Sequence, residues 1–206
     1  MSDIFVNCRI ETERLILRPY AIGDAPALQR IASDPQVLQY LPDDPLSIEE
    51  VKDIIAWSIG CHKKNTKEKL YKLNLTMLDK KTNELIGWCG LGPADWDLEQ
   101  IEIYYAVAPE RWRQGLTSEA TLALRDYAFD IIELKNLVGI TMSDNIASNK
   151  VLQKLGMSYQ GTLDRAPKDC DPYFLGQNLY VLANTGNRQD VLYREENEIP
   201  SPITTP

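Results

Sequence analysis

The sequence predicts one domain of the mixed α/β class. Its 206 residues are 44% hydrophobic and 25% charged, which is ordinary for a globular protein long enough to bury a core. Segments with the two-residue alternation of strands are interleaved with segments of helical period, and no segment repeats. A strand and two helices come first, then three strands that can pair with their neighbours, then strand–helix units. That order is typical of a mixed α/β domain.

Start and stop signals define the individual elements. Strands are expected at 10–18, 70–78, 84–91, 100–108, 136–142, 157–163 and 173–183, with a loop at Gly92-Pro93. Helices are expected at 25–34, 47–62, 117–132 and 145–155. Asp24 can cap the first helix, Pro35 should end it, and Ser47 with Glu50 forms a capping box for the second. We expect residues 1–184 to form the domain and the polar stretch 185–206 to be a mobile tail.

The charge balance excludes several classes of protein. Lys and Arg number 22 against 30 Asp and Glu, so the net charge is −8 with the single histidine neutral. A net acid lacks the basic stripe that a nucleic-acid backbone requires, so no nucleic-acid partner is expected. The chain begins without the basic and apolar regions of a signal peptide, and no apolar run reaches the ~18 residues of a membrane span. A cytoplasmic protein without membrane contact is therefore expected.

The cysteines and aromatic residues are expected to be structural. The cysteines are too scattered for a CxxC pair, so we expect reduced thiols, no disulfide framework and no metal site; they are Cys8, Cys61, Cys89 and Cys170. Cys61 precedes His62, but adjacent side chains diverge on a helix, which argues against a nucleophile–base pair. Trp57, Trp88 and Trp96 are expected to pack in the core or at its rim rather than to form a substrate cage.

The densest chemical signal lies between the strand at 100–108 and the helix at 117–132. Pro109 ends the strand, and a turn with Arg111, Arg113 and Gly115 leads directly into the helix. Such a turn presents free backbone N–H groups at the positive end of the helix dipole, and the arginines add charge, so it can hold a pyrophosphate. A strand–helix connection that merely contains arginines would have the same composition.

Three segments together resemble one known family. Residues 144–157, DNIASNKVLQKLGM, resemble the NxxSxxxxxKLGF segment of the GNAT superfamily of N-acetyltransferases, and the turn upstream resembles its [RQ]xxGx[GA] coenzyme A loop. The opening TERLILR at 12–18 is similar to the TxRLxLR start of the RimJ/RimL-type branch, the protein N-terminal acetyltransferases and their relatives. The similarity runs in order over about residues 10–183. It implies the GNAT fold, a central, largely antiparallel twisted sheet flanked by helices on both faces.

The resemblance also implies a binding site for acetyl-CoA, with no metal. The pantetheine arm would run along Tyr105, Ala106 and Val107, and the Val107 amide would meet the thioester carbonyl. The pyrophosphate would be held by the amides of Trp112, Arg113, Gln114, Gly115, Leu116 and Thr117. Asn145 would lie beside the pantetheine and Ser148 beside the thiol. Trp112 stands where the family has Arg or Gln. Thr117 stands where it has Gly or Ala, so its side chain could crowd the phosphate or donate a hydroxyl to it.

Two residues are candidates for catalysis by the same resemblance. Glu102 matches the strand position of a carboxylate base that acts through water, and alternation puts it on the face of Tyr104. A solvated carboxylate on a polar strand face is the alternative. The family's tyrosine acid is absent, since Leu152 occupies that position, so Ser148 is the candidate acid, as in RimL-like relatives. A helix-face hydroxyl bonded to the preceding turn is the alternative for Ser148. A further carboxylate of RimL-type enzymes could correspond to Asp164, Asp169 or Asp171.

These features predict transfer of the acetyl group of acetyl-CoA to a primary amine. An α-amine with a pKa of about 7.7–8.0 deprotonates near neutrality far more readily than lysine at about 10.4, which favours a protein or peptide N-terminus. Two alternatives are a small-molecule amine (a polyamine, an amino acid or an antibiotic) and a catalytically inactive coenzyme A-binding protein. A homodimer is possible, because GNAT relatives are often dimers.

Overall fold

The computed structural model describes residues 4–41, 44–164 and 171–185. The strands are β1 (Ile10–Glu11), β2 (Leu15–Pro19), β3 (Leu73–Asp79), β4 (Leu85–Ala94), β5 (Asp97–Val107), β6 (Asn136–Thr141), β7 (Ser158–Thr162) and β8 (Asn178–Ala183). The α-helices are α1 (Ala25–Ala32), α2 (Pro35–Leu38), α3 (Ile48–Lys64), α4 (Leu116–Asp130) and α5 (Ile146–Lys154). Short 3-10 turns lie at Ile22–Asp24, Pro109–Arg111 and Pro172–Phe174.

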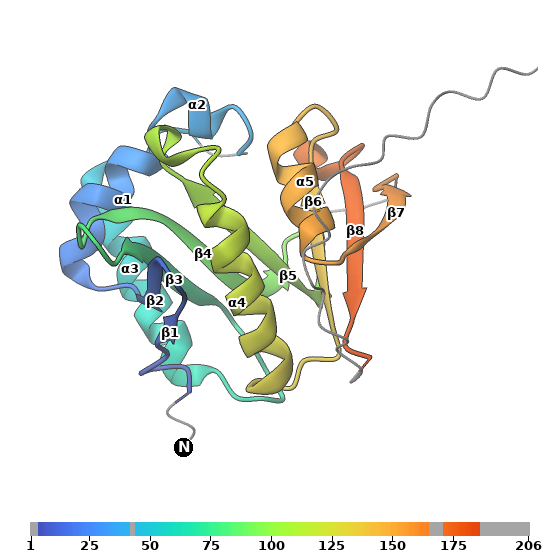
Figure 1. Cartoon of the computed structure of the whole chain (residues 1–206), viewed down its shortest axis with the longest axis horizontal. Helices are drawn as coiled ribbons and strands as arrows, with labels where there is room; N and C mark the ends of the chain where they lie inside the picture. The colour runs from blue at the N-terminus through green and yellow to red at the C-terminus, as the bar shows by residue number, and fades with distance from the viewer. Residues whose placement is uncertain (1–3, 42–43, 165–170, 186–206) are drawn as a thin grey trace, which may run out of the picture.

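One sheet of eight strands organises the chain, in the order β1-β2-β3-β4-β5-β6-β8-β7 (Figure 1). All neighbours pair antiparallel except β5 and β6, which run parallel. Between β5 and β6 the register contains a single pair, Glu102 with Val138. The predicted class of mixed α/β fold with a largely antiparallel sheet is confirmed, and the parallel junction marks where the sheet divides.

Helices cover both faces of this sheet. Helix α4 crosses β4 and β5 on one face (Figure 1), where Leu116, Ala120 and Leu124 pack in a buried cluster with the inward residues of β2–β5. Leu152 of α5 joins the same cluster. Helices α1 and α3 cover the opposite face, where Leu28 and Ile55 are buried. The burial of these apolar stripes is the main driving force that holds the helices on the sheet.

Several predicted boundaries differ from those in the structure. The strand expected at 10–18 is two short strands, because the Thr12 amide donates to the Leu15 carbonyl, at 3.0 Å, and turns the chain back. Pro35 ends α1 as predicted but also opens α2, since the Asp34 carboxylate accepts the Gln36 amide at 2.8 Å. The Gly92-Pro93 loop is instead the end of β4, opposite Glu102 and Ile101 of β5. The last strand begins at 178 rather than 173, after the turn at 172–174.

Several other predictions can be compared with the described residues. Cys8, Cys61 and Cys89 are buried free thiols, whereas Cys170 and the tail from 186 lie outside the described residues. His62 is buried, and its Nε2 accepts the Asn74 amide of β3 at 3.0 Å, a structural contact between α3 and the sheet. In the part of the chain that the structure describes, no helix is long and apolar enough to cross a membrane. No group of three or more metal-binding side chains occurs there either.

Candidate active site

The cleft lies where the sheet divides. Past Glu102, β5 pairs with β4 alone, and past Val138, β6 pairs with β8 alone. The Ala108 amide donates to the Ile86 carbonyl of β4, so by antiparallel alternation the Val107 amide points away from β4, into the division. The division and the first turns of α4 and α5 enclose a cavity of about 660 Å³. The hydroxyl of Tyr173 donates to the Tyr40 carbonyl at 2.7 Å, and both residues line this cavity.

The turn before α4 has the backbone form of an anion site. Gly115, the N-cap residue, has φ 74°, and Arg113 has φ 60°, so both lie in the left-handed region. A non-glycine residue in that region costs about 1–2 kcal/mol, so packing around the turn must hold Arg113 there. The amides of the first turn of α4 have no intrahelical acceptor, and the helix dipole makes their surroundings positive. Arg113, Gly115 and Thr117 all line the cleft.

The opening segment of the domain fixes this turn from outside. The Arg14 guanidinium donates from Nη1 to the Gln114 carbonyl at 2.9 Å and from Nε to Glu119 of α4 at 2.6 Å. The same carboxylate accepts the Thr12 hydroxyl at 2.5 Å and the Arg14 amide at 2.8 Å. The TxRL residues therefore act at long range: Thr12 and Arg14 hold the start of α4. Sequence reasoning identified this segment as a motif but missed its contact with the turn.

Two residues of the turn have other partners than the sequence suggested. Arg111 adds no free positive charge, because its guanidinium forms ion pairs with Asp79 at 3.4 Å and Glu84 at 2.5 Å, in the connection between β3 and β4. The indole N–H of Trp112 donates to the Val107 carbonyl at 2.7 Å, which ties the turn to the end of β5. The Trp112 side chain therefore has a place in the structure despite departing from the family pattern.

Positive charge in the cleft comes instead from three exposed side chains. Arg113 lines the cleft from the turn, and Lys150 and Lys154 line it from α5. Sequence reasoning missed both lysines. Their i,i+4 spacing, which places them on one face of α5, was the available signal.

Glu102 lies at the point where β5 and β6 part, and its carboxylate accepts the Ile140 amide of β6. Burial raises the pKa of Glu102 to about 7; Lys72 and the Ile140 amide oppose that rise, and Asp95 adds to it. A carboxyl group with a pKa near 7 can accept and release a proton at neutral pH. The Glu102 side chain is half-buried and lines the cleft, and its role as a base stays a prediction.

The start of α5 brings two hydroxyls together. Asn145 caps the helix by accepting the Ser148 amide at 3.1 Å. The Ser148 Oγ lies 3.0 Å from the hydroxyl of Tyr105 on β5, and either can donate to the other. Burial raises the pKa of Tyr105, so its hydroxyl is protonated at neutral pH. A tyrosine hydroxyl thus reaches the site from β5, although Leu152 occupies the expected position and is buried against Gly139.

The remaining predicted residues divide into two groups. Ala106, Val107, Trp112 and Asn145 line the cleft with those already described, whereas Gln114 and the buried Leu116 do not line it. Asp164 accepts the Thr162 hydroxyl at 2.6 Å, and Asp171 accepts the Tyr173 amide at 2.8 Å as the cap of a turn. Neither carboxylate lines the cleft, and Asp169 lies outside the described residues.

Residues 14–158 match the family model described as the acetyltransferase (GNAT) domain. The chain is 30% identical over 155 residues to a Bacillus subtilis (strain 168) protein named uncharacterized N-acetyltransferase YoaA, which covers 75% of this chain and 85% of YoaA. Two solved structures have a similar fold. One is RimL, a ribosomal L7/L12 α-N-protein acetyltransferase in complex with coenzyme A, with TM-score 0.71, 20% identity, and 87% and 99% of the two chains covered. The other is a ribosomal-protein-S5-alanine acetyltransferase from Vibrio fischeri, with TM-score 0.71, 18% identity, and 87% and 98% covered.

Proposed function

The chain belongs to the GNAT acetyltransferase family and is an acetyl-CoA-dependent N-acetyltransferase, and we propose that its acceptor is the α-amine of a protein or peptide N-terminus. The observation that carries the proposal is Glu102, whose pKa is raised to about 7 in the cleft. A proton moves readily between groups of similar pKa, and an α-amine at about 7.7–8.0 is much closer to this value than lysine at about 10.4. The names of the RimL and S5-alanine structures, which act on ribosomal proteins, support the same acceptor class.

The proposal assigns the coenzyme to the divided sheet and the turn. Backbone amides from Trp112 to Thr117, including those of Gln114 and Leu116, would hold the pyrophosphate, with Arg113 supplying charge. The arm of the coenzyme would follow Tyr105, Ala106 and Val107 on β5, with Asn145 opposite on α5. The Val107 amide, which points into the division, is the proposed donor to the thioester oxygen, where negative charge develops.

The proposed chemistry is direct attack of the neutral amine on the thioester carbon. Glu102 takes the proton that the amine nitrogen loses, through water or directly, as the new C–N bond forms. The C–S bond breaks, and the thiolate receives a proton from the pair Tyr105 and Ser148. Because these hydroxyls are hydrogen-bonded to each other, either can be the immediate donor. Water then returns a proton to the pair, and Glu102 releases to water the proton that it took.

The experiment measures free coenzyme A thiol released from acetyl-CoA in the presence of matched acceptors. One peptide has a free N-terminus and no lysine, its partner has a blocked N-terminus and one lysine, and spermidine represents small amines. The proposal predicts release with the first peptide only, and mass spectrometry should place the acetyl group on the α-nitrogen. Equal or faster transfer to the lysine peptide or to spermidine would refute the assignment of the acceptor.

A further inference from the structure

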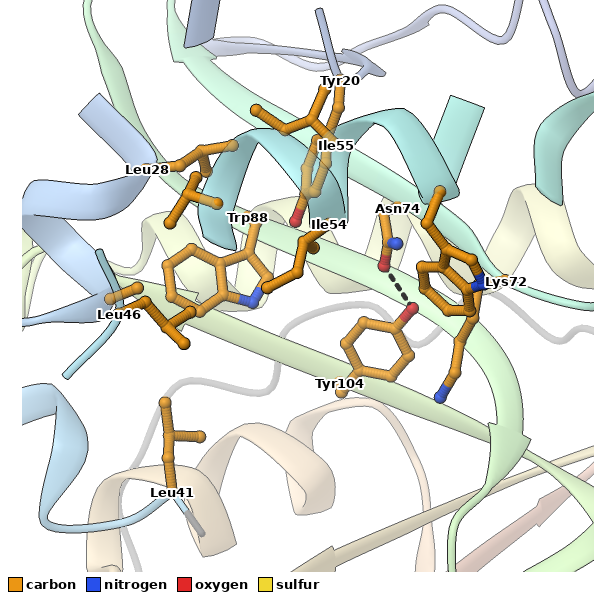
Figure 2. Close-up of a pocket in the computed structure, with 13 residues that line it drawn as sticks. Tyr20, Leu28, Leu41, Leu46, Ile54, Ile55, Lys72, Asn74, Trp88 and Tyr104 are labelled. Atoms are coloured by element: carbon orange, nitrogen blue, oxygen red, sulfur yellow. Dashed lines mark hydrogen bonds between the residues drawn. The ribbon is translucent and has the colours of Figure 1, made fainter. Parts of the chain in front are cut away.

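A second pocket adjoins the cleft on the face of β5 that α1 and α3 cover. It has a volume of about 230 Å³ and lies between α1, α3 and strands β3–β5 (Figure 2). Its walls are mainly apolar and aromatic, formed by Leu28, Leu46, Ile54, Trp57, Trp88 and Tyr104. An apolar cavity of about 150 Å³ can hold benzene, so this pocket has room for an aromatic ring.

The pocket and the cleft share part of their walls. Leu41 and Tyr104 line both cavities. Tyr104 lies two residues after Glu102, on the same face of β5, and that spacing corresponds to about 7 Å along a strand. A group held against the Tyr104 ring therefore places an amine a few bonds away next to the Glu102 carboxylate.

The polar atoms at the end of the pocket near Tyr104 are mostly occupied. The Tyr104 hydroxyl donates to Asn74 Oδ1 at 2.6 Å, and the side-chain Nδ2 of Asn74 donates to the Ser58 hydroxyl at 3.0 Å. Lys72 lies over the Tyr104 ring, 5.0 Å from its centre, and its ammonium group donates to the Pro93 carbonyl at 3.1 Å. This end presents ring faces and hydrocarbon to a ligand, and a charged or strongly polar ligand group would lose its hydration there.

A polar atom also faces the pocket. Tyr20 is 9% exposed, and its phenol oxygen is directed into the pocket (Figure 2). The Tyr20 hydroxyl can donate a hydrogen bond to, or accept one from, a polar atom of a ligand that enters the pocket.

Ile54 and Trp57 extend the apolar surface to the outside of α3. Ile54 is 39% exposed and Trp57 54% exposed, and both line the pocket. These two side chains give a large apolar group of the acceptor a continuous surface from solvent to Tyr104. Trp57 and Trp88, expected from sequence to serve packing alone, thus have free faces in the pocket.

We propose that this pocket selects acceptors whose first residue has an aromatic side chain, with tyrosine preferred over phenylalanine. The proposal rests on the proposed function. The aromatic ring would lie between Trp88 and Tyr104, its α-amine would lie at Glu102, and the Tyr20 hydroxyl would bond the phenol oxygen of a tyrosine. An N-terminal alanine or serine would leave the pocket unfilled.

The test compares peptides that differ only in the first residue: Ala, Phe or Tyr. One methylene group in a hydrophobic pocket changes kcat/KM by about 10–200-fold, so we expect Phe to exceed Ala by at least about 100-fold. Ile54→Asp should reduce that ratio at least about tenfold, because it puts a charge at the apolar wall. Ile22→Asp is the matched control, since Ile22 is 52% exposed and lines neither cavity. Tyr20→Phe should abolish the preference for Tyr over Phe and leave the Phe/Ala ratio unchanged.

Equal kcat/KM for the Ala and Phe peptides would overturn the proposal, as would a Phe/Ala ratio that Ile54→Asp does not change. If no peptide is acetylated, the proposed function fails, and calorimetric titration of the coenzyme A-bound protein with the same peptides still tests the pocket. At least about tenfold tighter binding of the Phe peptide than of the Ala peptide then supports the aromatic site, and equal binding overturns it.

Discussion

Replacing Glu102 by glutamine should make the protein more stable above pH 7 and less active. Burial raises the pKa of this carboxyl from its ordinary 4.5 to about 7. Ionising the group in the folded protein therefore costs free energy that ionising it in the unfolded chain does not. Glutamine keeps the acceptor for the Ile140 amide but cannot ionise.

The direction and size of this change in stability follow from the linkage between proton binding and folding. Because the folded pKa lies above the unfolded one, the contribution of Glu102 to stability is complete below pH 4.5 and is lost as the pH rises to about 7. The two pKa values differ by an amount that corresponds to about 3 kcal/mol. The unfolding free energy of the variant minus that of the wild type should therefore rise by up to about 3 kcal/mol across this range and stay constant at higher pH.

Urea denaturation from pH 4.5 to pH 8 measures this difference. Glu99→Gln is the matched control, because Glu99 is an exposed glutamate on the same strand. Its difference from the wild type should not depend on pH. A Glu102→Gln difference that is equally flat would refute the argument from burial. Separately, if Glu102 is the base, kcat of the variant should fall by at least about 100-fold, and an unchanged kcat at pH 8 would remove it from that role.

Three further substitutions test other parts of the structure. Gly115→Ala should lower the unfolding free energy by about 1–2 kcal/mol and weaken coenzyme A binding in calorimetry, because φ is 74°. Gly23→Ala, where an added methyl meets nothing within 4 Å, should do neither. Tyr105→Phe should lower kcat more than it raises the KM for acetyl-CoA, since the lost hydroxyl lies 3.0 Å from Ser148 Oγ; an unchanged kcat contradicts that role. His62→Gln should protect against acid: burial lowers the pKa of His62 to about 4, so the wild type loses up to about 3 kcal/mol as the pH falls from 6.5 to 4. If the unfolding free energies of variant and wild type fall equally in acid, His62 is not the cause of the loss.

Local signals predicted the elements whose ends are determined locally. The capping box of Ser47 and Glu50 placed the start of α3 within one residue of Ile48. The four residues of α2 are too few to show a helical period, so that helix was missed. Gly92 and Pro93 are turn formers by composition, yet they end β4, because the strand opposite continues through Glu102 and Ile101. The neighbouring strand decided that boundary, and no local rule contains this information.

The same distinction between local and long-range information holds for the candidate site. Residues of the turn and of the segment 144–157 could be placed around one cleft, because a strand–turn–helix unit fixes its own geometry. The partners of these residues could not be predicted. Arg14 and Glu119 are 105 positions apart, and Tyr105 and Ser148 are 43 apart. Such pairs depend on how α4 and α5 pack on the sheet, and a single sequence does not encode that packing in any readable pattern.

The single residue pair that joins β5 to β6 has a consequence for thermal stability. In the described residues, strands β6, β8 and β7 are joined to the rest of the sheet by one residue pair, Glu102 with Val138. A molecule lying in the division touches both parts and supplies contacts that the chain itself lacks there. Ligand binding should therefore raise the melting temperature. A ligand at a hundred times its Kd should add about 2.7 kcal/mol to the unfolding free energy. The melting temperature of this protein would then follow the acetyl-CoA concentration of its surroundings.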